Sequence, residues 1–455
     1  MDEFAELTRE ELIGLLRQMA ERIAYLEKEN EALRSQLAGG GDGAHAPPFV
    51  RPGRKPRSEE PRKKRGKWFG RMLEEATEDI EHVIGERCPD CGGLLSKPRE
   101  HARRQVIEIP ESRIRVIDHV IMAQRCGYCG KVHHAKLTVS DGVIGKHRFG
   151  ARLMSFVATL STANRIPVRM IQQVLRSLYG VHVSAGEIAE ILHKVAQLGK
   201  GEEQRILEEI RGSPVTCNDE TGWREDGLNG YLWCVATEDA RYYHRDKSRG
   251  QDVSKKILGE GYEGTLSADF YGGYNWYDGP IQRCWSHLTR DLDTLMEKHP
   301  ENTGVKRFCD SVMAVYRRGK RIAKALEIGK IPASKRFELA SGLEEQLLEI
   351  ARPWLKREEA AQHVLSKRVE RHGGEFFTFV RYEGVPSSNN AAERAIRPAV
   401  TARKISGGTR SRKGSETKST LMTLFGTWAL RKADLLTECH RMLTQSSSTP
   451  MTSPG

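Results

Sequence analysis

The stretch that decides the fold reads VTCNDETGW and covers residues 215–223. Its first half predicts a short strand, Val215–Asp219, that ends in an acid. A later stretch, LSADFYGGY at residues 266–274, repeats this design, because the predicted strand Thr265–Ala268 is followed by Asp269. Acids at the ends of neighbouring strands can meet at one edge of a sheet, so Asp219 and Asp269 are expected to lie close together.

A third acid comes from the segment SNNAAERAIRP, residues 388–398. Asn389 or Asn390 can cap a helix here, which places Glu393 in its first turns. Two Mg²⁺ ions need a carboxylate cluster, because acidic oxygens hold the metals while phosphates and waters complete the octahedra. The chain has 61 acids, so the alternative is that acids at strand ends only form turns. The candidate catalytic residues, also the candidate ligands of two catalytic Mg²⁺ ions, are Asp219, Asp269 and Glu393.

Basic residues follow Glu393 closely. Residues 394–418 hold eight lysines or arginines and one acid, Glu416. Each basic side chain that neutralises a phosphate releases a condensed counterion, so this excess predicts a DNA-backbone surface beside the proposed metals. The candidate DNA-binding residues of this segment are Arg394, Arg397, Arg403, Lys404, Arg410, Arg412 and Lys413.

Upstream of the acids, residues 148–200 fit a helix-turn-helix region. Pro167 opens one helix, Gly180 ends it, and Ser184 with Glu187 forms a capping box that starts the second. Any helical hairpin would give this pattern, so plain helical packing is the alternative to DNA binding. The candidate phosphate contacts are Arg165, Arg169 and Lys194. Further along, strands are expected at Tyr231–Thr237 and Arg241–Arg245, and residues 290–380 are largely helical by pattern.

Four cysteines form two C-x-x-C pairs, and a glycine follows each pair. The pairs are Cys88 with Cys91 and Cys126 with Cys129. This spacing is typical of four thiolates on one structural Zn²⁺ ion, here in a zinc-binding domain over residues 80–140. Alternating apolar residues predict a hairpin of two strands between the pairs, Gln105–Ile109 and Ile114–Ile121. Free thiols or a redox pair are the alternative.

The N-terminal segment, residues 1–38, predicts a leucine-zipper coiled coil. Apolar residues keep a heptad spacing, and Asn30 at an a position favours a parallel homodimer. An amphipathic helix packed on its own domain is the alternative. Residues 39–79 are predicted to be a basic, disordered linker that either tethers DNA or is simply solvated. Residues 445–455 are predicted to be a disordered tail.

The chain has 455 residues and a formal net charge of +12. The length predicts several domains, and the charge favours a polyanionic partner, with DNA the first candidate and an anionic membrane surface the second. There is no run of about 18 apolar residues, so no membrane-spanning helix is expected. Nine cysteines without a disulfide framework indicate a reducing, cytoplasmic setting.

Four segments resemble the transposases of insertion-sequence family sixty-six, namely residues 218–223, 269–274, 284–287 and 389–398. The order of coiled coil, basic linker, four-cysteine knuckle, helix-turn-helix and core over nearly the whole chain is also similar to that family. The resemblance implies a multidomain α+β protein with an α/β RNase H-like catalytic core. Residues 212–290 and 386–444 would form this core, and residues 291–385 would be a helical insertion in it.

The resemblance also implies DDE chemistry, with Asp219 and Asp269 as the two Asp and Glu393 as the Glu. Water activated by Mg²⁺ would cut DNA at the element's terminal repeats, and the freed 3′-hydroxyl would attack target DNA. The enzyme would be bacterial and nucleoid-associated, and element-encoded accessory proteins are implied as helpers. Glu220 beside Asp219 leaves two acids open to the metal role, and the resemblance favours Asp219.

The C-x-x-H formed by Cys284 and His287 falls inside the implied core. His287 is expected to lie near the active site, with a satisfied core histidine as the alternative. The linker is poorer in glycine, and richer in arginine, lysine and glutamate, than the family's usual linker. Two other hypotheses stay open for the whole chain: a catalytically inactive DNA-binding regulator derived from a transposase, and a zinc-containing scaffold. The three intact acids favour the enzyme, and the basic residues after Glu393 disfavour the scaffold.

Overall fold

The computed structural model describes residues 74–109, 111, 114–137, 141–144 and 147–445. The predicted coiled coil, residues 1–38, lies outside the described residues, as do nearly all of the predicted linker and the tail from residue 446. The chain divides into two compact units, residues 1–108 and 109–455. Among the helices of the described part, none is both long enough and apolar enough to cross a membrane.

The region of the paired cysteines contains little regular structure. Residues 74–108 form only a single bridge, between Arg87 and Leu94. The second unit opens with a short antiparallel hairpin, β1 (Ala123–Arg125) and β2 (Val132–His134). The strands predicted at 105–109 and 114–121 are wrong, because the described residues of both segments form no strand. Their apolar side chains stay exposed, so they lack the buried face that fixes a strand in a sheet.

Four helices precede the main sheet: α2 (Ala151–Thr162), α3 (Val168–Tyr179), α4 (Ala185–Leu198) and α5 (Lys200–Arg211). The predicted capping box starts α4, since the Glu187 amide donates to Ser184 Oγ at 3.1 Å and the Ser184 amide donates to the Glu187 carboxylate at 2.8 Å. Gly180 ends α3 with a left-handed φ of 66°. These helices share one apolar core with α13 (Arg412–Leu430) and α14 (Leu435–Gln445).

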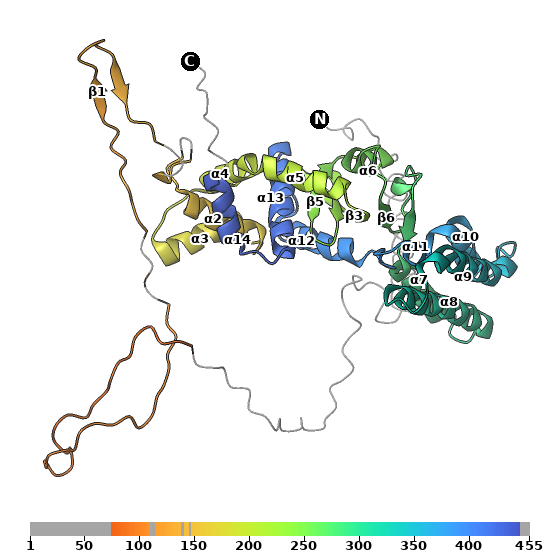
Figure 1. The fold of residues 1–455 in the computed structure, drawn as a ribbon, viewed down its shortest axis with the longest axis horizontal. Coiled ribbons are helices and arrows are strands. Elements are labelled where there is room, and N and C mark those ends of the chain that lie inside the picture. Colours follow the sequence, from red (N-terminus) through yellow and green to blue (C-terminus); the bar gives the residue numbers. More distant parts are fainter. Residues whose placement is uncertain (1–73, 110, 112–113, 138–140, 145–146, 446–455) are drawn as a thin grey trace, which may run out of the picture. The chain divides into compact units, whose positions relative to one another are not determined.

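A mixed sheet of five strands forms the centre of the second unit, in the order β5-β4-β3-β6-β7. Figure 1 labels three of them, β5, β3 and β6. The first three strands pair antiparallel, and β6 and β7 are added parallel to β3. Asp226 and Gly227 connect β3 to β4 with positive φ values of 51° and 77°, as a type I′ turn requires. The strands are β3 (Val215–Glu225), β4 (Leu228–Ala236), β5 (Arg241–Asp246), β6 (Thr265–Ala268) and β7 (Ile281–Arg283), and α6 (Gln251–Leu258) connects β5 to β6.

Strand β3 is longer than the predicted strand Val215–Asp219. Its antiparallel pairing with β4 continues to Glu225, whereas its parallel pairing with β6 stops at Cys217 opposite Ser267. Asp219 therefore lies inside a strand, just beyond the point where the parallel pairing stops, and the prediction that it ends the strand is wrong.

Two helices at the end of the chain cover the sheet. α12 (Asn390–Ser406) packs on β3 and β4, and its small side chains Ala395 and Ala399 share one buried apolar cluster with Trp223 of β3. α13 runs along β5, the edge strand. The backbone amides of Arg241 and Tyr243 donate to the hydroxyls of two threonines of α13, Thr427 and Thr423, both at 3.0 Å. This helix therefore occupies the edge that would otherwise be open to another strand.

Between β7 and α12 the chain forms a helical insertion with its own apolar core (Figure 1). This confirms the helical character predicted for residues 290–380. The two ends of the insertion meet, because the Trp285 amide donates to the Ser387 carbonyl at 3.1 Å and the Asn389 amide donates to Cys284 Sγ at 3.1 Å. The main helices of the insertion are α7 (Trp285–Lys298), α8 (Thr303–Glu327), α9 (Arg336–Ala351), α10 (His363–His372) and α11 (Thr378–Arg381).

Candidate catalytic site

Asp219 lies in a cluster of acids on the side of the sheet where β6 ends. Burial and the negative charges of Glu220, Asp269 and Glu393 raise the pKa of Asp219 to about 7. Asp219 Oδ1 accepts a hydrogen bond from the Glu220 amide at 2.9 Å, and Asp269 follows directly on β6. The three predicted acids, which are far apart in the sequence, therefore come together around Asp219.

Glu393 reaches this cluster from the start of α12. The side chain of Asn389 positions the helix, since its Nδ2 donates to the Asn218 carbonyl of β3 at 2.6 Å. Asn389 occupies the N-cap position and Glu393 lies in the first turn, as predicted, but the Asn389 side chain makes no cap hydrogen bond. Asn389 instead attaches the first turn of α12 to the strand residue next to Asp219.

Glu220, the neighbour of Asp219, belongs to a closed network. Its side chain is 2% exposed, and its carboxylate accepts hydrogen bonds from Arg249 at 2.7 and 2.9 Å and from Tyr274 Oη at 2.6 Å. Burial is the main cause that raises the pKa of Glu220, and these donors oppose it. Because its oxygens already have partners, Glu220 is less available to a metal than Asp219.

His287 lies beside Glu393. His287 Nδ1 is 3.7 Å from Glu393 Oε1, and both atoms are shielded from solvent without a hydrogen-bond partner in the described part of the chain. The side chain of Cys284 is the main cause that raises the pKa of His287. Cys284, His287 and Glu393 each place a potential ligand atom within 4.8 Å of the others.

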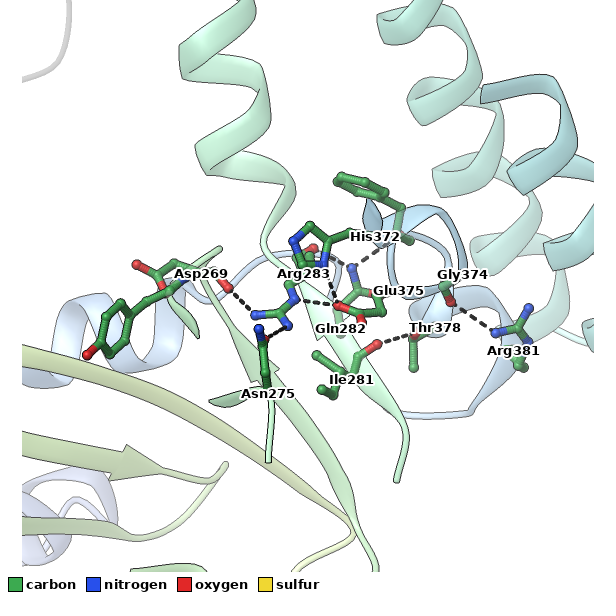
Figure 2. Close-up of polar contacts among 12 residues, drawn as sticks. Asp269, Asn275, Ile281, Gln282, Arg283, His372, Gly374, Glu375, Thr378 and Arg381 are labelled. Atoms are coloured by element: carbon green, nitrogen blue, oxygen red, sulfur yellow. Dashed lines mark hydrogen bonds and ion pairs between the residues drawn. The ribbon is translucent and has the colours of Figure 1, made fainter. Parts of the chain in front are cut away.

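Asp269 is held through both its side chain and its backbone. Its Oδ1 accepts the Tyr271 amide at 2.9 Å, and its carbonyl accepts Arg283 Nη1 at 2.8 Å (Figure 2). Sequence reasoning did not single out Arg283, because an arginine before Cys284 gives no pattern that distinguishes it from a surface residue.

The donors around Asp219 fit Mg²⁺. Asp219, Asp269 and Glu393 offer only oxygen, the ligand that Mg²⁺ prefers. No lysine or arginine of the described ranges forms an ion pair with any of the three, although Asp219 is largely buried. Like charges gathered without a compensating cation are unfavourable, and divalent cations would neutralise them. The sulfur and nitrogen atoms of Cys284 and His287 suit Mg²⁺ less well.

The two cysteine pairs form equivalent turns, one in each unit. The Gly92 amide donates to the Cys88 carbonyl at 2.9 Å, and the Gly130 amide donates to the Cys126 carbonyl at 2.9 Å. Both glycines have positive φ, 73° and 67°. Backbone amides lower the pKa of Cys88 and of Cys126, which favours the thiolates that bind Zn²⁺. His133 and His134 lie on β2 and are exposed.

The predicted DNA-binding residues differ in exposure. Arg394 and Arg397 are exposed on α12, whereas Arg403 donates to Thr221 Oγ1 at 3.2 Å and so attaches α12 to β3. Exposed ion pairs join Arg412 to Glu416 and Lys413 to Glu190. Lys404 and Arg410 are exposed, Arg169 is exposed on α3, and Arg165 and Lys194 are partly buried.

Two family models match this chain. The model described as Transposase IS66 family matches residues 146–417, and the one described as zinc-finger binding domain of transposase IS66 matches residues 86–130. The first range includes Asp219, Asp269 and Glu393, and the second includes all four paired cysteines. The second match supports a zinc-binding role for that region.

Relatives occur in Sinorhizobium fredii. The uncharacterized protein y4qI is 26% identical over 406 residues, which covers 81% of this chain and 72% of the relative. The uncharacterized protein y4hP is 23% identical over 387 residues, which covers 76% of this chain and 68% of the relative. The uncharacterized protein y4jO is 31% identical over 150 residues, 32% of this chain and 42% of the relative. Because the first family match spans more than half of the chain, this chain belongs to the IS66 family of transposases.

Proposed function

We propose that this chain is an active DDE transposase that binds the ends of its element and catalyses Mg²⁺-dependent DNA strand cleavage and strand transfer. The observation that carries the proposal is the convergence of Asp219, Asp269 and Glu393 around one buried carboxylate. The mixed sheet supports an RNase H-like core, because three antiparallel strands are followed by two parallel ones and the first acid lies on the central strand. This core spans residues 212–290 and 386–444, interrupted by the insertion at 291–385.

In this proposal Asp219, Asp269 and Glu393 hold two Mg²⁺ ions. When bound, the ions supply activation of the attacking oxygen and stabilisation of the leaving oxygen in an in-line displacement. The chain's own residues place the acids: β3 carries Asp219, Asn389 fixes the start of α12, and His287 lies against Glu393. Arg394 and Arg397, which are exposed on α12 just after Glu393, bind the phosphate backbone of the DNA.

The remaining parts of the chain bind the element ends and hold two copies of the chain together. The helix-turn-helix region at 148–200 and the four-cysteine domain at 80–140, with one structural Zn²⁺, bind the element ends. The coiled coil at 1–38 makes a homodimer, the linker at 39–79 tethers DNA, and element-encoded accessory proteins assist. The capping box that starts α4 supports the helix-turn-helix region. The zinc-finger match supports the four-cysteine domain, and the net charge of +12 supports binding to DNA.

A cleavage and strand-transfer assay on DNA that carries the element's own ends tests this proposal. Wild type, Asp269→Asn and Glu393→Gln are compared with Mg²⁺ and with EDTA. Asp278→Asn is a matched control, because Asp278 is exposed in the same β6–β7 connection. We expect metal-dependent products from wild type and the control, and none from the two acid variants. Products that persist in either acid variant would refute the DDE assignment. Binding without products in every sample, even with the accessory proteins added, would identify a DNA-binding regulator.

A further inference from the structure

Arg283 is a buried cation next to the candidate catalytic site. It ends β7, and its side chain is 1% exposed. Its guanidinium donates to the Asp269 carbonyl at 2.8 Å and to Asn275 Oδ1 at 2.7 Å, and it forms an ion pair with Glu375 (Figure 2). A buried charge is costly unless several partners satisfy it, so this arginine depends on all three contacts.

The partner that neutralises Arg283 belongs to the helical insertion. Glu375 lies in the 3-10 turn Gly373–Glu375, directly after α10. Its carboxylate also contacts His372 Nδ1 at 3.1 Å. Arg283 therefore connects the backbone of Asp269 on one side to the insertion on the other, as Figure 2 shows.

A second set of contacts joins the insertion to the loop that follows β6, through Phe270. Phe270, the residue after Asp269, packs against the rings of His372 and Phe376, with ring centroids 5.7 and 5.8 Å apart. The guanidinium of Arg368 on α10 lies 4.6 Å from the centroid of the Phe270 ring. The insertion thus contacts both the carbonyl side of Asp269, through Arg283, and the side chain that follows it.

We propose that Arg283 is a positioning residue through which the helical insertion, by way of Glu375, fixes the place of Asp269 in the metal-binding cluster. The consequence for metal binding rests on the proposed function, in which Asp269 is a ligand. The hold of Arg283 on the Asp269 loop does not rest on it. Groups that orient a metal ligand typically change metal affinity or activity by roughly 10- to 100-fold when they are removed.

The test compares Arg283→Met, Arg283→Lys and Glu375→Gln with the matched control Arg336→Met in the full-length protein. Arg336 is also a partly buried arginine of the insertion. It pairs with Glu383 at 3.4 Å and donates to the Val380 carbonyl at 3.2 Å, and in the described part of the chain it bonds neither Asp269 nor the turn that carries Glu375. Three readouts are taken: hydrogen exchange of residues 269–275, the rise in melting temperature as Mg²⁺ is added, and the Mg²⁺ concentration for half-maximal cleavage.

We expect faster exchange of residues 269–275 in Arg283→Met and Glu375→Gln, and a half-saturating Mg²⁺ concentration raised roughly 10-fold or more. Arg283→Lys, which keeps a cation, recovers part of both effects. Arg336→Met lowers the melting temperature but leaves exchange of the loop and Mg²⁺ affinity as in wild type. Equal effects of Arg283→Met and Arg336→Met on all readouts, or loop exchange unchanged in Arg283→Met, would overturn the inference. Wild-type protein that neither cleaves DNA nor responds to Mg²⁺ would instead refute the proposed function, and loop exchange would still decide the role of Arg283.

Discussion

Asp219 and Glu220 are adjacent acids that the fold uses differently. Glu220 has three donors and almost no exposure, whereas Asp219 accepts one backbone amide and is surrounded by like charges. From the sequence, both residues were candidate metal ligands, and only the family resemblance favoured Asp219. Because side chains alternate along a strand, Asp219 and Glu220 are expected to face opposite ways. This alternation does not predict which of the two acids is bonded by Arg249 and Tyr274.

At Asp219, replacement by asparagine should abolish strand cleavage and leave DNA binding intact. The amide keeps the size of the side chain and removes the charge that would hold the metals. Cleavage of labelled element ends and gel-shift titration on the same DNA measure the two activities. Full cleavage by Asp219→Asn would show that another acid carries the reaction.

At Glu220, replacement by glutamine should lower stability and leave Mg²⁺ affinity unchanged. The change removes the charge-assisted hydrogen bonds to Arg249 and Tyr274, which corresponds to a loss of about 1–3 kcal/mol in the free energy of unfolding. Denaturant titration measures the stability, and Mg²⁺-dependent stabilisation measures metal binding. A large loss of Mg²⁺ affinity at unchanged stability would move the metal role from Asp219 to Glu220.

At the scale of elements, the edges of the sheet depend on partners that are distant in the sequence. Thr423 and Thr427 of α13 satisfy the amides of β5 on one edge. On the other edge, Thr378 Oγ1 donates to the Ile281 carbonyl of β7 at 2.5 Å, and the side chain of Gln282 accepts the Phe379 amide at 2.8 Å. On both edges, therefore, threonine hydroxyls from distant helices bond backbone groups of the edge strand.

Replacing Thr423 by valine should destabilise the protein by about 1–3 kcal/mol, because the buried amide of Tyr243 loses its acceptor while the shape is kept. Thermal or denaturant unfolding measures the loss. Thr401→Val is the matched control, since Thr401 is exposed on α12 and bonds only within its own helix. If Thr423→Val and Thr401→Val lose the same amount of stability, water must replace the lost acceptor at the amide of Tyr243.

Local sequence patterns predicted the elements whose positions depend mainly on neighbouring residues. The capping box at Ser184 and the strand Thr265–Ala268 were found where they were expected. The extension of β3 beyond Asp219 was missed, because it depends on pairing with β4 and not on strand propensity. β7 and α6 were missed because three or eight residues give little periodicity. The Arg283–Glu375 pair joins segments that no local pattern relates.

At the scale of the whole molecule, the family resemblance predicted the acids that converge, whereas composition alone predicted only a basic chain of several domains. Spacing could not show that the insertion returns the chain to its starting point, because this depends on how α7–α11 pack. The coiled coil stays a prediction, since residues 1–38 lie outside the described ranges.

Deleting residues 1–38 should convert a dimer into a monomer, because the heptads and Asn30 are the predicted source of association. Light scattering coupled to size-exclusion chromatography gives the mass in solution. A truncated protein that stays dimeric would place the main interface elsewhere in the chain.

Because the two ends of the insertion meet, the three acids can come together only late in the synthesis of the chain. Asp219 and Asp269 leave the ribosome first, and Glu393 follows only after the whole insertion, a delay on the order of ten seconds at bacterial elongation rates. Until the insertion folds and brings Ser387 back to Trp285, Glu393 is not held beside the other two acids. In the proposed enzyme, a nascent chain would therefore lack the complete acid cluster until Glu393 has been made.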